Sequence, residues 1–204
     1  MEDLRLHMAT KQPIPHLSVM GDMALRLGRV HEFCGPARRT LALRVAARLD
    51  GPVIWIRPGW QVERLNPEGV VGLGVEPGRL ILVDPRKGED ILWAAEEALR
   101  SGAVALVVCE VHTLPGLTPV RRLHLAAEAG AAASGAAPPL GLLLAQARGG
   151  VPGVESRWYM TCTHGAAGDA WRLERRRARA EPPMAWLVGC DGKTRPVTAR
   201  RPAP

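Results

Sequence analysis

A strand, a glycine turn and a helix stand where a phosphate-binding loop would be expected. Residues 30–34 have the apolar character of a short strand, Gly35-Pro36 makes a sharp turn, and residues 39–49 carry apolar side chains at helical spacing. A strand that leads through glycine into a helix can bind phosphate groups, because backbone N–H groups point out of the turn. The chemistry to test at this turn is therefore nucleotide binding.

The turn lacks several parts that a nucleotide needs. A working loop has glycine, four residues and then Gly-Lys-Ser/Thr, whose lysine reaches the terminal phosphates and whose hydroxyl binds magnesium. Here four residues separate Gly35 from Thr40, the second glycine is missing, and Arg38 and Arg39 are the nearest cations. Arginine does not reproduce the point contact of a lysine. We expect the remnant of a nucleotide site, with no cofactor and no catalytic residue. The alternative is an ATPase with an atypical loop.

Composition indicates one globular domain with an appendage. Of the 204 residues, 47% are hydrophobic and only 4% aromatic, so we expect a core of leucine, valine and alanine. Residues 172–204 hold nine basic and three acidic residues, which account for +6 of the net charge of +7. Concentrated positive charge favours an acidic partner, either nucleic acid or a protein face, but a solvated surface would have the same composition.

The cysteines and histidines do not form a metal-binding pattern. Cys34, Cys109, Cys162 and Cys190 are far apart and lie in or beside apolar stretches, which favours reduced and partly buried thiols. We find no signal peptide and no apolar run of transmembrane length. We therefore expect a cytoplasmic protein without a metal and without membrane contact.

Apolar runs and helical periodicity alternate along the middle of the chain. Strands are expected at 30–34, 53–57, 80–84, 103–111 and 140–145, buried on both faces. Helices are expected at 39–49, 89–101 and 118–132. Such alternation predicts a mostly parallel sheet with helices on both faces. Three further strands, at 158–163, 170–177 and 184–188, predict an antiparallel extension at one edge.

The chain divides into three parts. Residues 1–28 are an N-terminal arm, in which 18–27 has the composition of a short helix; residues 29–150 are the core; and residues 151–204 are the antiparallel extension with a basic tail, whose last residues are expected to fray. The apolar residues of the arm either dock on a partner or cap the chain's own core: Leu4, Leu6, Ile14, Leu17 and Met20.

Residues 73–114 resemble the core of the RecA recombinase. A Leu-Gly-Val at 73–75 leads to a strand, and an acidic helix ends in an Ala-Leu-x-Ser-Gly-Ala-Val segment at 98–104. Residues 32–43 are similar to the segment that holds the phosphate loop in RecA, and residues 140–148 to a later strand that ends in glutamine. The resemblance implies an α/β fold with a RecA-like, mostly parallel β-sheet flanked by helices.

The departures from RecA fall on its ATPase parts. Besides the shortened loop, Pro58-Gly59-Trp60 replaces the turn whose glutamate activates the attacking water in RecA. Glu110 stands in place of the magnesium-linked aspartate and is a partial substitute at best. The remnant of the site comprises Gly35, Arg38, Arg39, Thr40 and Glu110. The DNA-binding loops of the recombinase cannot be transferred residue by residue.

A RecA-like chain of this size with a degenerate nucleotide site and a basic tail resembles the ImuA family. These SulA-like or RecA-like proteins belong to bacterial mutagenesis cassettes, and the segments at 93–99, 121–128 and 171–174 fit them. The resemblance implies a non-catalytic adaptor of SOS-induced translesion synthesis. Its partners would be ImuB, an inactive Y-family polymerase homologue, and an error-prone replicative-type polymerase, and it suggests contact with RecA and a nucleoid-associated location. The SulA label implies a further alternative, a cell-division inhibitor.

Nine arginines are candidates for contact with single-stranded or damaged DNA or with an acidic partner: Arg121, Arg122, Arg172, Arg175, Arg176, Arg177, Arg179, Arg200 and Arg201. For the helical pair, a solvated face is an equal alternative. Alternation along the expected strand places Arg175 and Arg177 on the side of Leu173. Four aromatic residues of this region either stack on unpaired bases or, as is more common, pack in the sheet: Trp158, Tyr159, Trp171 and Trp186.

Overall fold

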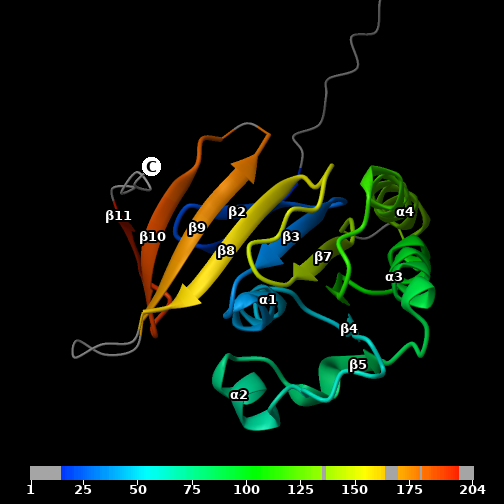
Figure 1. Cartoon of the computed structure of the whole chain (residues 1–204), viewed down its shortest axis with the longest axis horizontal. Helices are drawn as coiled ribbons and strands as arrows, with labels where there is room; N and C mark the ends of the chain where they lie inside the picture. Colours follow the sequence, from blue (N-terminus) through cyan, green and yellow to red (C-terminus); the bar gives the residue numbers. More distant parts are fainter. Residues whose placement is uncertain (1–14, 135–136, 164–169, 180, 198–204) are drawn as a thin grey trace, which may run out of the picture.

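The computed structural model describes residues 15–134, 137–163, 170–179 and 181–197. Nine strands form one sheet: β3 (Val30–Cys34), β4 (Val53–Ile56), β5 (Leu80–Val83), β6 (Leu106–Val111), β7 (Leu140–Ala145), β8 (Ser156–Cys162), β9 (Ala170–Ala178), β10 (Met184–Gly189) and β11 (Thr194–Val197). Their spatial order is β11-β10-β9-β8-β3-β7-β6-β4-β5 (Figure 1). The strands from β8 to β5 in this order are parallel, which confirms the α/β class expected from the alternating pattern.

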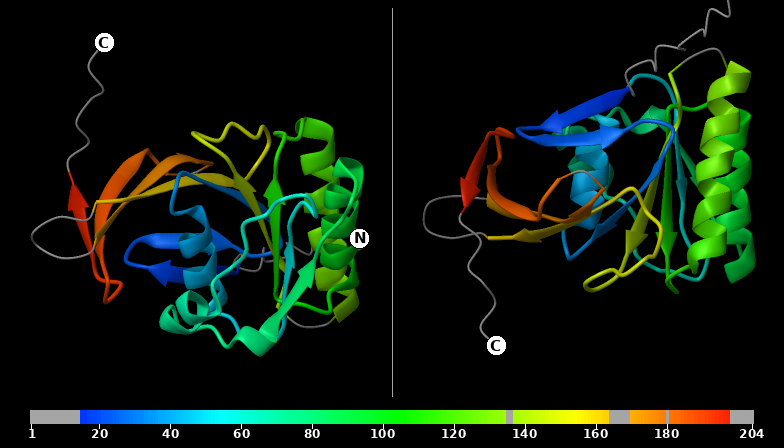
Figure 2. Two further views of the ribbon diagram at one scale, coloured as in Figure 1. Left: turned by 60° about the horizontal axis from the view of Figure 1, so that its bottom comes forward. Right: turned by 90° about the horizontal axis from the view of Figure 1, so that it is seen from above.

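Helices cover both faces of the sheet, as Figure 2 shows. On one face lies α1 (Arg38–Ala46), together with a hairpin of β1 (His16–Met20) and β2 (Met23–Arg26). On the other face lie α3 (Gly88–Ser101) and α4 (Leu117–Ser134). Each face has its own apolar cluster, because the strands of the parallel part are buried on both sides. Gly102, with φ of 63°, ends α3 in the left-handed conformation that glycine permits.

The hairpin of β1 and β2 lies where the sequence predicted a short helix. Residues 18–27 do not form a helix; β1 and β2 pair antiparallel across a turn at Gly21 and Asp22. The burial pattern explains the difference, since Met23 and Leu25 are buried and Ala24 between them is exposed, which is the alternation of a strand. Gly21, with φ of 48°, permits the tight turn, and an added Cβ there would lie 1.9 Å from Oγ1 of Thr194.

Three further details differ from the expected elements. β5 is an edge strand rather than a buried one, and Ile81 and Leu82 are about half exposed, because only β4 pairs with it. The connection after β4 contains α2 (Pro67–Gly72), capped by the side chain of Asn66, and a short 3-10 turn, η1 (Pro77–Arg79). Within the C-terminal extension, β8 is parallel to β3 and antiparallel to β9, and β10 pairs antiparallel with both β9 and β11.

The extension shares its core with the parallel part of the sheet. Trp158, Trp186 and Leu173 are fully buried and belong to the same apolar cluster as α1 and the hairpin. The rings of Trp158 and Trp186 lie 5.9 Å apart. The C-terminal strands are therefore an integral part of the sheet, and their removal would expose this cluster. The division of the chain at residues 28 and 150 stays a prediction.

Candidate functional site

The backbone N–H groups of the turn between β3 and α1 donate hydrogen bonds to carbonyl groups of the protein itself. Gly35 donates to the carbonyl of Ala147 (3.1 Å), Ala37 to that of Met160 (3.1 Å), and Arg38 to that of Gly35 (3.3 Å). Pro36 has no N–H to offer. In a phosphate-binding turn, such N–H groups would donate to the ligand. Here all three donate to carbonyl groups of the protein. Gly35 itself has φ of 90°, and an added Cβ would lie 2.4 Å from the carbonyl oxygen of Met160.

Glu110, the candidate magnesium ligand at the end of β6, is bound on both of its oxygens by neighbouring side chains. Arg39 donates to Oε1 at 2.9 Å and to Oε2 at 2.7 Å, in the two-pronged geometry that suits a carboxylate. Nε1 of Trp55 also donates to Oε1 (2.9 Å), and Nε2 of Gln61 to Oε2 (3.3 Å). Because Glu110 is only 4% exposed, these four bonds occupy the face through which it would meet a metal ion.

Arg38 is the basic residue of the remnant that does not bind Glu110. Its Nη1 donates to the carbonyl of Gly35 (3.2 Å), whereas its buried Nε has no hydrogen-bond partner. Partial burial lowers the pKa of Arg38, because desolvation disfavours the charged form, although Glu110 acts against this. Thr40 lies half-buried in the first turn of α1. The fold thus brings the residues of the remnant together, and Arg38 is the arginine of the pair whose guanidinium is not bound to Glu110.

A hollow of about 590 Å³ opens at the carboxyl ends of β3, β4, β6 and β7. This is the edge at which parallel sheets place their ligands. Its walls come from the connections that follow these four strands: Arg38, Arg39, Trp60, Gln61, Val62, Glu63, His112, Gln146 and Ala147. Sequence reasoning placed Arg39 and Glu110 in the site but missed Trp55 and Gln61, because nothing in local spacing indicates hydrogen bonds that span 49 to 71 residues.

A second buried carboxylate fixes the connection that follows β7. Glu32, on β3, is fully buried and accepts hydrogen bonds from the N–H groups of Gly150 (2.6 Å) and Val151 (3.2 Å). Nε of Arg157 also donates to it. An added Cβ at Gly149, whose φ is 71°, would lie 2.4 Å from Oε1 of Glu32. The segment that follows β7, on this side of the hollow, is therefore held in place by hydrogen bonds to Glu32.

The arginines of β9 separate into two faces. Arg172 and Arg176 both donate to Glu174, at 2.8 and 3.0 Å, and these bonds hold the pKa of Glu174 below its usual value although burial alone would raise it. The guanidinium of Arg176 lies 3.7 Å above the ring of Tyr159. Tyr159 in turn packs against the apolar cluster that α3 and α4 form on this face of the sheet.

Arg175 was predicted to contact DNA or a partner, but it is buried. It is 6% exposed, lies over the rings of Trp158 and Trp186, and bonds with the carbonyl of Pro182 and the carboxylate of Glu181. Arg175 lies on the side of Leu173, as simple alternation predicts, but the register shifts by one residue between Arg175 and Arg177, so Arg177 leaves that side. Arg177 is exposed, whereas Arg175 is a packing residue.

The remaining candidates are scattered. Arg121 is exposed on α4, whereas Arg122 forms an ion pair with Glu96 of α3 at 2.6 Å. Arg200 and Arg201 lie outside the described residues. Among the aromatic residues, Trp158 and Trp186 are buried, which supports packing rather than base stacking, and Arg44 lies 4.8 Å from the ring of Trp171. The seven candidate arginines in the described part of the chain therefore do not form one continuous basic surface.

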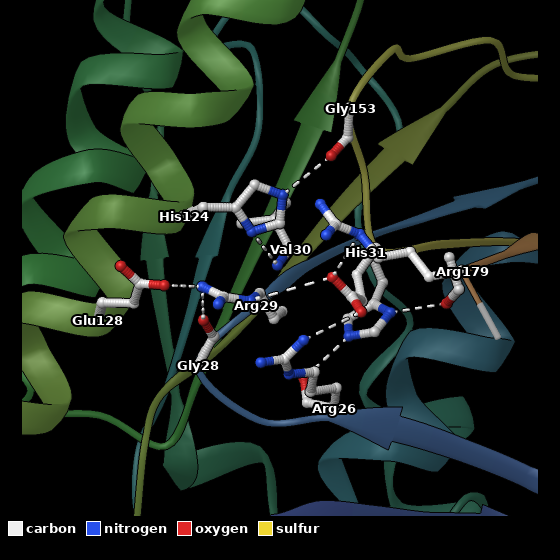
Figure 3. Close-up of polar contacts among 11 residues, drawn as sticks. Arg26, Gly28, Arg29, Val30, His31, His124, Glu128, Gly153 and Arg179 are labelled. Atoms are coloured by element: carbon white, nitrogen blue, oxygen red, sulfur yellow. Dashed lines mark hydrogen bonds and ion pairs between the residues drawn. The ribbon is translucent and has the colours of Figure 1, made fainter. Parts of the chain in front are cut away.

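Arg179 belongs to a polar cluster at the amino ends of β3 and β8, drawn in Figure 3. Glu155 is 8% exposed and pairs with Arg179 (3.3 Å) and Arg26 (3.5 Å). Arg29 pairs with Glu155 at 3.9 Å and also with Glu128, toward which it points in Figure 3. In residues 15–134, 137–163, 170–179 and 181–197, no group of three histidine, cysteine or acidic side chains is placed to hold a metal ion.

His31 is the buried titratable centre of this cluster. Its Nε2 donates to the carbonyl of Arg26 (3.0 Å), so Nδ1 accepts from the hydroxyl of Ser156 (2.6 Å), which accepts in turn from Nε1 of Trp158 (2.8 Å). Burial lowers the pKa of His31 to about 4, and it also lowers that of His124, whose ring bonds with Val30 and Gly153. Both imidazoles are neutral at pH 7.

We predict that Arg39→Met lowers the free energy of unfolding by about 3 kcal/mol, because a buried carboxylate is left with only neutral donors. Urea unfolding measures the change. The double variant Arg39→Met/Glu110→Gln should recover part of the loss, since the uncompensated charge is gone. Arg121→Met, on an exposed position of α4, should change stability by less than about 0.5 kcal/mol. An equally small effect for Arg39→Met would show that the pair is not stabilising.

We also predict that His31 makes the protein less stable as the pH is lowered. Its folded pKa of about 4 lies below the ordinary value of 6.5, so the unfolded chain takes up a proton first as the pH drops. The stability is fully present above pH 6.5, decreases toward pH 4, and is lower by about 2 kcal/mol at pH 5. Urea unfolding at pH 8 and pH 5 should show a smaller decrease in His31→Gln. His112 is exposed, so the variant His112→Gln should lose as much stability between pH 8 and pH 5 as the wild type does. If His31→Gln also lost as much stability as the wild type, His31 would not be the group responsible.

Comparison with known proteins supports the core. No family model matches the chain. RecA of Ruminococcus albus is 34% identical over 111 residues, which cover 48% of this chain and 27% of that protein. RecA of Nocardioides sp. is 35% identical over 108 residues, covering 48% and 30%, and RecA of Mycobacteroides abscessus is 34% identical over 121 residues, covering 52% and 34%. The matched length is about half of this chain and about a third of the RecA proteins.

In the part of the chain that the structure describes, every helix is too short or too polar to span a bilayer. The parallel sheet with its flanking helices and the partial match to RecA lead to the same conclusion. This chain has a RecA-like core.

Proposed function

We propose that this chain is a non-catalytic RecA-like adaptor of DNA-damage-induced translesion synthesis. Its partners would be ImuB, with an error-prone replicative-type polymerase, RecA and DNA as further members of the assembly. The RecA-like core supports a role in DNA metabolism, and the ImuA resemblance of the sequence supports the specific pathway. Each partner requires a direct test.

One observation carries the non-catalytic part of the proposal. The carboxylate of Glu110, where RecA-like ATPases hold their metal ion, accepts two hydrogen bonds from Arg39, which itself occupies the loop that would bind phosphates. The ion pair between Arg39 and Glu110 thus occupies both the residue that would bind the metal ion and a residue of the segment that would bind phosphates. The N–H groups of Gly35, Ala37 and Arg38 are engaged as well, so phosphate binding would require the turn to open.

A second candidate function is an ATPase with an atypical loop. The observation that favours it is the hollow of about 590 Å³, which lies at the edge where a nucleotide would bind and whose wall includes Arg38. Catalysis there would require Arg39 to release Glu110 when nucleotide and magnesium enter. The connection after β4 offers Glu63 on the wall of the hollow as an acidic group.

Turnover and binding distinguish the two functions. We expect the wild-type chain to release no more phosphate from ATP and magnesium than the double variant Arg38→Gln/Glu110→Gln does. This should hold with and without single-stranded DNA. A RecA protein assayed in parallel serves as the active control. The same preparation should bind purified ImuB in a direct binding assay. ATP turnover that is lost in the double variant would assign an ATPase, and absence of both turnover and ImuB binding would overturn the adaptor.

Contact with DNA is tested by substitution, because removing residues 172–204 would delete most of β9 and all of β10 and β11 from the sheet. We expect the affinity for fluorescent single-stranded DNA to fall steeply between low and moderate salt. Arg177→Ala should reduce the slope of log K against log salt by roughly 1, as expected for one phosphate contact. Lys193→Ala, on the exposed turn before β11, is the control. No binding at low salt would remove DNA from the proposal.

A further inference from the structure

The rim of the hollow displays apolar side chains on a rigid support. Trp60 is 50% exposed and Val62 is 85% exposed, and both line the hollow. Their connection is held from beneath by Arg57, which is 3% exposed, pairs with Asp84 at 2.6 Å, and donates to the carbonyls of Gln61 and Glu63 at 3.3 Å. Exposed apolar residues on a preorganised segment are a mark of interaction surfaces, since little order is lost on binding.

The hollow also contains a cation, Arg38, whose charged form is favoured by the nearby charges of Glu110 and Glu63 but which is not bound to either carboxylate. Arg39 is paired with Glu110, but Arg38 has no ion-pair partner within the described ranges, and its Nε is without a hydrogen bond. Partial burial makes this charge costly, and a carboxylate that accepts from the guanidinium would offset the cost. Glu63, the acidic residue of the wall, is exposed at the rim.

The donor set favours a carboxylate over a chain of phosphates. Phosphates require several N–H groups, and those of Gly35, Ala37 and Arg38 are bound to carbonyls of the protein. A carboxylate requires only the guanidinium. The volume of about 590 Å³ is large enough for more than one side chain, and Trp60 and Val62 provide an apolar wall beside the cation.

We propose that this hollow is the docking site for an extended peptide of a protein partner, which places an aspartate or glutamate on Arg38 and an apolar side chain against Trp60 and Val62. The proposal rests on the adaptor function and names the chemistry of the partner. It gives the altered nucleotide site a use that needs neither magnesium nor a phosphate loop. The pair between Arg39 and Glu110 then forms the floor of a peptide site.

Selection from a displayed library of random 12-residue peptides on the immobilised full chain tests this proposal. We expect enrichment of peptides in which an acidic residue stands within two positions of leucine, phenylalanine or tryptophan. The most enriched peptide is then synthesised with a fluorescent label, and its affinity is measured by anisotropy. Arg38→Gln should weaken it at least 10-fold, and Val62→Ser several-fold. Lys193→Gln, the matched loss of an exposed charge far from the hollow, should leave it unchanged.

A second comparison separates loss of contact from loss of fold. The peptide with its acidic residue replaced by the amide should bind wild type and Arg38→Gln equally, because the shared ion pair is absent from both complexes. Val62 is exposed, so Val62→Ser should unfold at the wild-type temperature. No enrichment, enrichment without acidic residues, or equal binding of the acidic peptide to Arg38→Gln would each overturn the proposal.

The two proposals can fail separately. Failure of peptide selection with no ATP turnover and intact ImuB binding would remove the peptide site and leave the adaptor. ATP binding that is abolished by Arg38→Gln, with magnesium-dependent turnover, would assign the hollow to a nucleotide and overturn both. Peptide binding that ATP at millimolar concentration does not displace would support the site as proposed.

Discussion

The pairing of Glu110 with Arg39 is the constraint on which the carboxyl edge of the sheet depends. A carboxylate that is removed from water is costly unless it is paired and its lone pairs are satisfied. Arg39 supplies the charge, and Trp55 and Gln61 supply the remaining donors, so one carboxylate connects α1, β4 and the segment after β4 to β6. The same bonds that stabilise this edge engage the groups that ATP chemistry would use.

Much of the basic character of the chain is internal. Arg39, Arg157 and Arg175 each meet a carboxylate while largely buried or half-buried, and Arg179 faces the buried Glu155. Positive charge counted along the sequence therefore overstates what a partner can reach. The positions that stay open are distributed between the hollow, the outer face of β9 and the surface of α4, which fits several modest contacts better than one large nucleic-acid groove.

The order and type of most elements followed from the sequence, because buried parallel strands and amphipathic helices have distinct periodicities. Three expectations failed. Residues 18–27 were expected to form a helix and form a hairpin, β5 was expected to be buried and is an edge strand, and Arg175 was expected on the surface and is packed between tryptophans. The exposure of β5 follows from its position at the end of the sheet, and the burial of Arg175 follows from Trp158 of β8 and Trp186 of β10, whereas the hairpin has a strand alternation that was overlooked in the sequence.

Residue type and local spacing were enough to indicate a RecA-like α/β core and to show that the turn at Gly35 lacks the second glycine and the lysine of a working phosphate loop. Which of two neighbouring arginines binds Glu110 could be seen only in the folded chain. Arg38 and Arg39 are adjacent and chemically identical, and both line the hollow, yet the guanidinium of Arg39 binds the buried carboxylate of Glu110 whereas that of Arg38 donates to the carbonyl of Gly35. Long-range packing sets that difference, and it separates the structural residue from the candidate binding residue.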